Sequence, residues 1–294
     1  MTAPKTTTNG LHNRIKGKGK TPAPPMPDSS GEVEQSNVFA LPDTNLDYLH
    51  VVVAGTTEAM TNKMSDQAVK SMMSGVIDKP KEKTQKPGSE AEAAFMASHV
   101  CLVKPGKGDP WERFTEHVYG IKVIPFKKGA VDAMSHLKIK GKNVMQGAFF
   151  MHGPFRGVTP LLSQAPELTR AVVDNHGLRN PEELFALAAK PKIDARAITT
   201  SNGMGGKGTA SVSIRPLFED WFAEFYVGYY SKIIQPKQLI QLIQTAGMSI
   251  GVGSYRAARS GDMFGLYRVV GMQGMPTGWE PKRYRIDQNG MPIA

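Results

Sequence analysis

The spacing of apolar residues along the chain predicts alternating strands and helices. The run LDYLHVVVAG at 46–55 has the length and the β-branched residues of a strand, and Gly55 ends it. The segment 121–142 places apolar residues on one face of a helix and lysines on the other, with Pro125 in the first turn. Strand and helix in this order suit one half of a mixed α+β domain.

The middle of the chain is less regular, because prolines and charged residues interrupt the apolar periods. Apolar positions at helical or alternating spacing between these interruptions still predict individual elements. We expect, in chain order, a short helix over 65–77, a helix leading into a strand over 91–103, a strand over 144–152 and a mainly helical stretch over 159–189.

The last third has the clearest pattern. A helix starting at Pro236 has one continuous apolar stripe, and Gly247 stands where a helix cap would be. Together the elements predict an α+β fold, a ferredoxin-like (RRM-like) antiparallel sheet with helices on one face and with helical and loop insertions near 78–120 and 155–208. The strands expected in this part are 210–215, ended by Pro216, then 221–230 and 264–270.

Composition divides the chain into one domain and two flanking segments. Residues 1–42 combine lysines, glycines and a Pro-rich run, and they cannot bury enough surface to offset their ordering entropy. We expect a disordered basic arm there, followed by a single domain over 43–276. The tail 277–294 mixes aromatic and cationic residues, and it either packs across the domain or stacks on bases.

The charge of the chain favours polyanionic partners. It has 36 Lys and Arg against 26 Asp and Glu, a net charge of +10, so nucleic acid is the first candidate and an anionic membrane the second. No apolar run approaches the roughly 20 residues of a membrane span, and no secretion signal is present, so we expect a cytoplasmic protein without a membrane partner. Cys101 alone cannot form an internal disulfide, which agrees with a reducing compartment.

No sequence pattern indicates an enzyme. The seven histidines are dispersed, without the short spacings of metal motifs. The glycine-rich run 199–209 is not a Walker loop, because Ser201 and Gly208 stand where that motif needs a glycine and a hydroxyl residue. Isolated carboxylates such as Asp194 suit surface or turn roles. We therefore expect a non-catalytic protein with no metal and no cofactor.

The stretch 246–270, AGMSIGVGSYRAARSGDMFGLYRVV, has the composition of an anion-binding loop. Glycine lets the main chain approach an anion, and arginine supplies planar donors. A dinucleotide turn is excluded, because Arg256 stands in place of the third glycine and a helix precedes the loop. Tyr255, Phe264 and Tyr267 either stack on bases or pack in the core.

Lysines outside this stretch extend the predicted site. Lys127 and Lys128 form either a phosphate-contacting ridge or an ordinary solvated helix face, and Lys207 lies in a glycine-rich tip that can contact a polyanion. The predicted nucleic-acid-binding residues are Gly251, Gly253, Tyr255, Arg256, Arg259, Arg268, Lys127, Lys128 and Lys207.

The last third also resembles a known family. The helix PKQLIQLIQTAGMSIGVG and the following SYRAARSGDMFGLYRV resemble the C-terminal part of RAMP-superfamily proteins, which include the repeated backbone subunits of CRISPR effector complexes. The runs SIRPLFEDWFAEFYVGYY and GVGSYRAARSGDMFGLYRV resemble a group of uncharacterised phage and prophage proteins. The resemblance is clearest over 211–270. The strand after the loop begins Met-Phe-Gly-Leu here, where the CRISPR subunits often have Gly-Phe-Gly-Arg.

The resemblance implies an RRM-like sheet and side-by-side assembly, as a homo-oligomer or filament, along single-stranded RNA or DNA. We therefore expect a non-catalytic nucleic-acid-binding protein, encoded by a phage or mobile element and located in the cytoplasm of the bacterial host. The alternative is a structural or interaction protein of phage assembly, or an inhibitor of a host effector complex, that uses the same fold. Copurifying nucleic acid distinguishes the two.

Overall fold

The computed structural model describes residues 46–63, 88–166, 168, 180–200, 209–256, 263–281, 285–286 and 292–293. The chain divides into two units, Met1–Pro42 and Asp43–Ala294, and every described residue belongs to the second. Three predictions lie outside the described residues: the arm over 1–42, the helix over 65–77 and the glycine-rich tip that contains Lys207.

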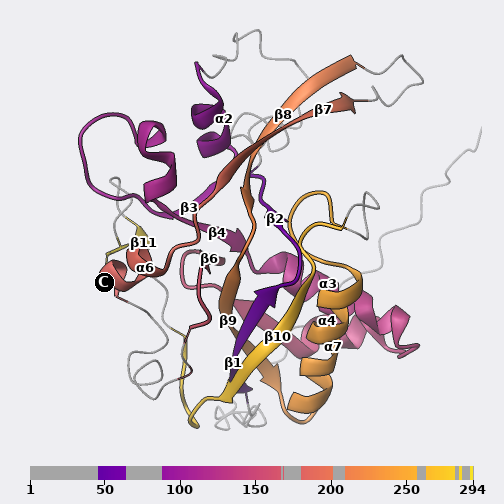
Figure 1. Cartoon of the computed structure of the whole chain (residues 1–294). Coiled ribbons are helices and arrows are strands. Elements are labelled where there is room, and N and C mark those ends of the chain that lie inside the picture. Colours follow the sequence, from indigo (N-terminus) through magenta and orange to yellow (C-terminus); the bar gives the residue numbers. More distant parts are fainter. Residues whose placement is uncertain are drawn as a thin grey trace, which may run out of the picture. The chain divides into compact units, whose positions relative to one another are not determined.

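A seven-stranded antiparallel sheet forms the centre of the second unit (Figure 1). Its strands have the order β10-β1-β9-β6-β4-β3, and β5 also pairs with β9. In chain order, β1, α3, β5, β9, α7 and β10 make a βαββαβ unit, so the predicted ferredoxin-like α+β fold is confirmed. These elements are β1 (Leu46–Gly55), α3 (Ile124–His136), β5 (Phe149–His152), β9 (Phe222–Tyr230), α7 (Pro236–Ser249) and β10 (Tyr267–Gly274).

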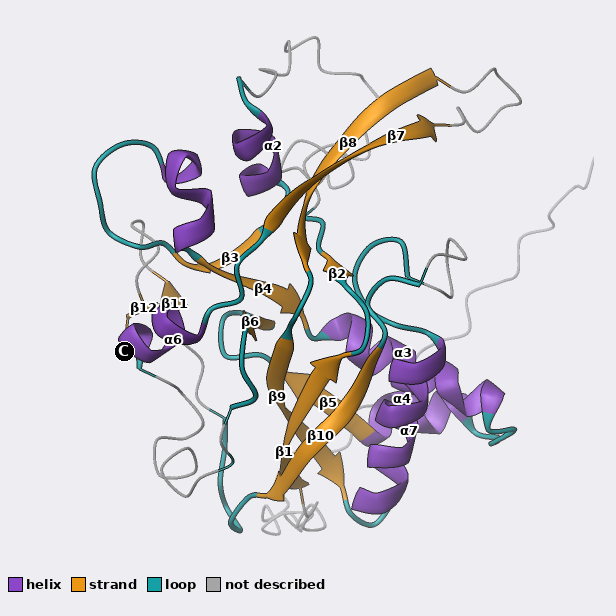
Figure 2. Ribbon diagram, viewed as in Figure 1, coloured by secondary structure: helices purple, strands orange, loops and turns teal. Residues whose placement is uncertain are grey.

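The remaining elements fall mainly into two chain segments. One lies between β1 and α3, and contains β2 (Ala59–Met60), α2 (Glu90–Met96), β3 (His99–Leu102), the 3-10 helix η1 (Pro110–Glu116) and β4 (Val118–Lys122). The other lies between β5 and β9, and contains β6 (Val158–Leu162), α6 (Pro181–Leu187), β7 (Lys192–Thr200) and β8 (Thr209–Phe218). The helix α4 (Lys142–Ala148) lies between α3 and β5. The hairpin of β7 and β8 forms a second sheet with β2, and β11 (Arg285–Ile286) pairs with β12 (Pro292–Ile293) (Figure 2).

The hydrophobic core lies between one face of the large sheet and the helices α3 and α7. Val51 and Val53 of β1 point to this side, as does Phe225 of β9, whose ring centroid lies 4.9 Å from that of Phe126 in α3. Because side chains alternate along a strand, the residues between them point to the opposite face. That face carries a buried polar pair, His50 and Glu224.

Gly247 lies inside α7 rather than at its end, so its predicted role as a cap is wrong. A Cβ at this position would overlap the carbonyl oxygen and the ring of Tyr267 in β10. The glycine therefore allows the helix and the edge strand to approach each other closely.

Three further predictions are wrong in part. Pro216 does not end the strand expected over 210–215, because β8 continues through it to Phe218. Only the second half of 144–152 is a strand, because the first half forms α4, in which Ala148 is buried. The stretch 159–189 begins as β6, which pairs with β4 and β9, and only Pro181–Leu187 is a described helix. β6 has the sequence VTPLL, and its Pro160 is more typical of the first turn of a helix than of the interior of a sheet.

Candidate nucleic-acid interface

The predicted site centres on the Gly/Arg loop, residues 250–266, which follows α7; positions 257–262 lie outside the described residues. Two of its glycines adopt left-handed backbone conformations, Gly251 with a φ of 71° and Gly253 with a φ of 79°. A Cβ on Gly253 would overlap the carbonyl oxygen of Met60. Both predicted glycines are therefore required by the path of the main chain.

Backbone hydrogen bonds hold the described part of the loop against residues 58–60, which follow β1 and include β2. Val252 donates its N–H to Gly265 over 2.9 Å, and Gly265 donates to Glu58 over 2.7 Å. Ser254 donates to Met60 over 2.8 Å. Because these bonds fix the backbone on both sides of positions 257–262, the loop presents its side chains from a rigid base.

An arginine–aromatic cluster joins the loop to the hairpin of β7 and β8. The guanidinium carbon of Arg215 lies 4.8 Å from the ring centroid of Tyr255, and that of Arg196 lies 4.4 Å from the ring centroid of Phe264. Asp194 accepts two hydrogen bonds from Arg196, of 2.6 and 3.2 Å. The predicted Tyr255 thus contacts two arginines. Asp194, expected to be an isolated carboxylate in a surface or turn position, instead lies within β7 and pairs with Arg196.

The hairpin register explains why these groups meet. Asp194 is directly paired with Arg215 across β7 and β8, and Arg196 follows Asp194 by two positions on the same strand. All three side chains therefore share one face of the hairpin. The spacing of Asp194 and Arg196 in the sequence was the available signal, but only the pairing of the strands reveals that Arg215 joins them.

The other predicted residues occupy different positions. Arg256 is half-buried, and its backbone forms an isolated parallel β-bridge with that of Phe264. Arg268 is exposed near the start of β10. Lys127 lies in the first turn of α3 with its Nζ 5.8 Å from the ring centroid of Phe149 in β5, and Lys128 is exposed beside it. Arg259 and Lys207 lie outside the described residues.

Tyr267, named as a stacking candidate, is buried in the core, where its ring centroid lies 5.2 Å from that of Phe126. Burial raises the pKa of its hydroxyl. The stacking role predicted for Tyr267 is therefore wrong, and the core alternative is correct.

Two lysines missed by the sequence interpretation act on His99. Lys63 follows β2, and Lys122 ends β4, where it shares a face with His99 because His99 is paired with Gly120. Burial, and then the positive charges of Lys122 and Lys63, lower the pKa of His99 to about 4. The two ammonium groups therefore lie close enough to His99 to disfavour its protonation.

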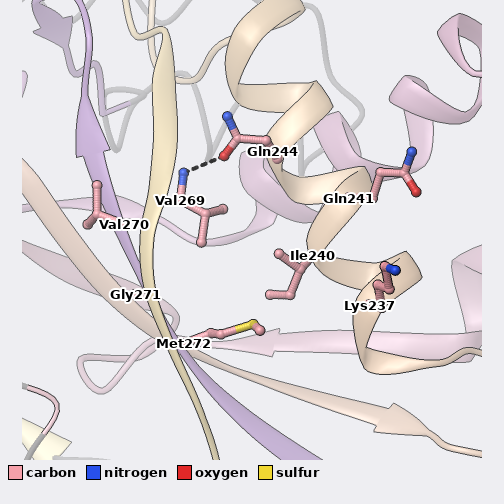
Figure 3. Close-up of a pocket in the computed structure, with 8 residues that line it drawn as sticks. All are labelled: Lys237, Ile240, Gln241, Gln244, Val269, Val270, Gly271 and Met272. Carbon is pink, nitrogen blue, oxygen red and sulfur yellow. Dashed lines mark hydrogen bonds between the residues drawn. The ribbon is translucent and has the colours of Figure 1, made fainter.

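A groove of about 630 Å³ between α7 and β10 is chemically different (Figure 3). Gln244 accepts a hydrogen bond of 2.7 Å from the N–H of Val269 there. The lining carries one charged side chain, Lys237, and none of the predicted site residues. The lining residues are Lys237, Ile240, Gln241, Gln244, Val269, Val270, Gly271 and Met272.

The described residues contain no group of three or more His, Cys, Asp or Glu side chains placed to hold a metal ion. Within the same part of the chain, no helix is long and apolar enough to cross a membrane.

The solved structures that are similar to this chain include subunits of two CRISPR assemblies. A chain of the type III-B Cmr-beta complex bound to cognate target RNA has 9% sequence identity and a TM-score of 0.39, and the match covers 80% of this chain and 62% of that chain. A chain of a CRISPR RNA-guided surveillance complex has 10% identity and a TM-score of 0.31, with 77% and 68% covered.

No protein-family model matches the sequence, and no curated protein matches it.

Proposed function

We propose that this protein binds single-stranded nucleic acid without catalysing a reaction on it, and that several copies lie side by side along the strand. The observation that carries the proposal is the arginine–aromatic cluster of Arg196, Arg215, Tyr255 and Phe264 at the Gly/Arg loop. Sites for single strands combine cationic groups, which follow the phosphates, with aromatic rings, on which bases stack.

The distribution of charge supports this role for the loop. Arg256 follows Tyr255 in the loop and Arg268 lies just beyond it, and the chain as a whole has a net charge of +10. Asp194 holds the guanidinium of Arg196 over the ring of Phe264. The guanidinium is therefore already oriented when a phosphate approaches the edge that Asp194 does not occupy. The side-by-side assembly rests on the resemblance of residues 211–270.

Purification without nuclease treatment tests the proposal first. We expect nucleic acid to copurify, to be removed by high salt, and to be digested by nucleases that act on single strands. The purified protein should then shift single-stranded RNA or DNA oligonucleotides in a gel at low salt. A nucleic-acid-free protein that shifts neither oligonucleotide would contradict the proposal and favour the alternative of an interaction protein.

A further inference from the structure

The sheet face opposite α3 and α7 carries a cluster of aromatic rings that is separate from the Gly/Arg loop. His50 and Tyr226 are directly paired across β1 and β9, and their rings stack with centroids 4.8 Å apart at an angle of 20°. Tyr48 of β1 lies 5.9 Å from the ring of His152 in β5. Gly228 permits this gathering, because a Cβ there would lie 2.9 Å from the ring of Tyr48.

One aromatic residue from outside the sheet closes the cluster. The ring centroid of Trp279 lies 4.7 Å from that of Tyr226 and 5.3 Å from that of Tyr48, and only 7% of the residue is exposed. Trp279 belongs to residues 275–281, here named the cover segment. Met275 donates its N–H to the carbonyl of Tyr48 over 2.9 Å at the start of this segment.

The cover segment is attached mainly through this single side chain. Pro276, Thr277, Gly278 and Glu280 are all exposed, and the backbone turns at Gly278, whose φ is 79°. The backbone N–H of Trp279 donates a hydrogen bond of 3.1 Å to the carbonyl of Pro276, within the segment itself. A segment with one buried anchor can leave the sheet without disturbing the core.

Several polar atoms at or near this aromatic cluster lack hydrogen-bond partners. Within the described part of the chain, Nδ1 of His50, Oε1 of Gln273 and Nε1 of Trp279 are buried without a hydrogen-bond partner. His50 and Gln273 are directly paired across β1 and β10, and the other ring nitrogen of His50 bonds to Glu224 over 3.1 Å. Buried polar atoms without partners are unfavourable. An indole offers one donor and no acceptor, whereas a nucleobase offers several of each around a ring of similar size.

We propose that Trp279 occupies the position of an unpaired base, and that single-stranded nucleic acid displaces the cover segment and stacks a base on Tyr226 and Tyr48. The inference rests on the proposed function and adds a second contact for the same strand. Thr56, next to the end of β1, bonds to Leu266 of the Gly/Arg loop, so the two contacts lie near opposite ends of β1. Tyr48 and Gly55 are seven positions apart in β1, which corresponds to about 23 Å at about 3.3 Å per residue.

The sign of a mutational effect tests this inference. Trp279→Ala removes an intramolecular competitor, so this variant should bind a single-stranded oligonucleotide about tenfold more tightly than the wild type, on the scale of one stacked base. Its affinity for an abasic oligonucleotide with the same backbone should not change. Trp279→Phe keeps a competing ring and should behave like the wild type, and Tyr48→Ala should weaken binding of the intact oligonucleotide only.

Hydrogen exchange of the wild-type protein provides a second test, which holds even if Trp279→Ala fails to fold. Saturation with the intact oligonucleotide should accelerate amide exchange over 277–280, and the abasic oligonucleotide should not. Unchanged exchange in the cover segment on binding of the intact oligonucleotide would overturn the inference while leaving the proposed function intact. A protein that binds neither oligonucleotide would instead contradict the proposed function.

Discussion

The guanidinium of Arg196 lies 4.4 Å from the ring centroid of Phe264, and this contact connects the hairpin of β7 and β8 to the Gly/Arg loop. The same guanidinium lies 5.7 Å from the ring centroid of Tyr255. Two hydrogen bonds to Asp194 fix its plane. Because one side chain bridges two segments that are far apart in the sequence, we expect hairpin and loop to be stabilised together.

Arg196→Ala should therefore loosen the loop as well as the hairpin. A cation–π contact and a partly buried ion pair are lost, so the free energy of unfolding should fall by about 1–2 kcal/mol. Amide exchange at Val252 and Ser254 should become faster. The matched control on the same hairpin is Lys192→Ala, which removes an exposed ion pair with Glu219 worth less than about 1 kcal/mol. Equal effects of the two substitutions on the loop would contradict the bridge.

Asp194→Asn should change stability and binding in opposite directions. The amide preserves the size of the side chain but removes the negative charge beside Arg196, which weakens a charge-assisted pair. The loss of a carboxylate next to the proposed interface should also strengthen binding to single-stranded oligonucleotides at low salt. Chemical denaturation and fluorescence anisotropy measure the two effects. Weaker binding by a folded Asp194→Asn protein would be inconsistent with the proposed position of the interface.

Gly253→Ala should destabilise the loop. The left-handed backbone is strained for alanine, and the added Cβ meets the carbonyl oxygen of Met60, so the expected loss is about 1–3 kcal/mol. Gly274→Ala provides a control, because a Cβ there has nothing within 4 Å. That substitution should change the free energy of unfolding by less than about 0.5 kcal/mol. Thermal unfolding measures both variants. Similar losses of unfolding free energy in the two would contradict the backbone geometry described for the loop.

His99 should make stability depend on pH. Its pKa is lowered from 6.5 to about 4 by burial first and by Lys122 and Lys63 second, so the unfolded chain binds a proton in this range before the folded protein does. The contribution of neutral His99 to stability is complete above pH 6.5 and is lost as the pH falls towards 4.

His99→Gln should flatten the fall in melting temperature over this pH range, relative to the wild type. Lys122→Gln should raise the pKa of His99 in an NMR titration, because it removes one of the charges that lower the pKa. An unchanged pKa of His99 in the Lys122→Gln protein would show that the lysine lies too far from the histidine to affect its protonation.

The sequence predicted the βαββαβ unit because its helices and strands have clear periods. The stripe of α7 and the strand β1 were both recognised in this way. The start of 159–189 differs from the prediction because β6 is a short strand between β4 and β9 that contains Pro160, a residue that is unusual inside a sheet.

The site was predicted less completely, for a different physical reason. Composition identifies Tyr255 and Arg256 as loop residues, but the contacts of Arg196 and Arg215 depend on the register of a hairpin. Trp279 likewise meets Tyr226 across more than fifty positions of chain, although the tail was expected to pack or to stack. Local patterns do not contain such long-range pairings.

The salt dependence of binding tests the central claim most directly. The measurement compares the affinity for a single-stranded oligonucleotide across a salt series in the wild type, in the Arg256→Ala, Arg259→Ala double variant and in Lys237→Ala, whose charge lies in the separate groove. Each phosphate contact on a single strand contributes about 0.7 to the slope of log affinity against log salt. We predict that the double variant lowers the magnitude of this slope by about 1.4 and weakens binding to all sequences alike, whereas Lys237→Ala matches the wild type. An unchanged slope and affinity in the double variant would contradict the proposed role of the Gly/Arg loop.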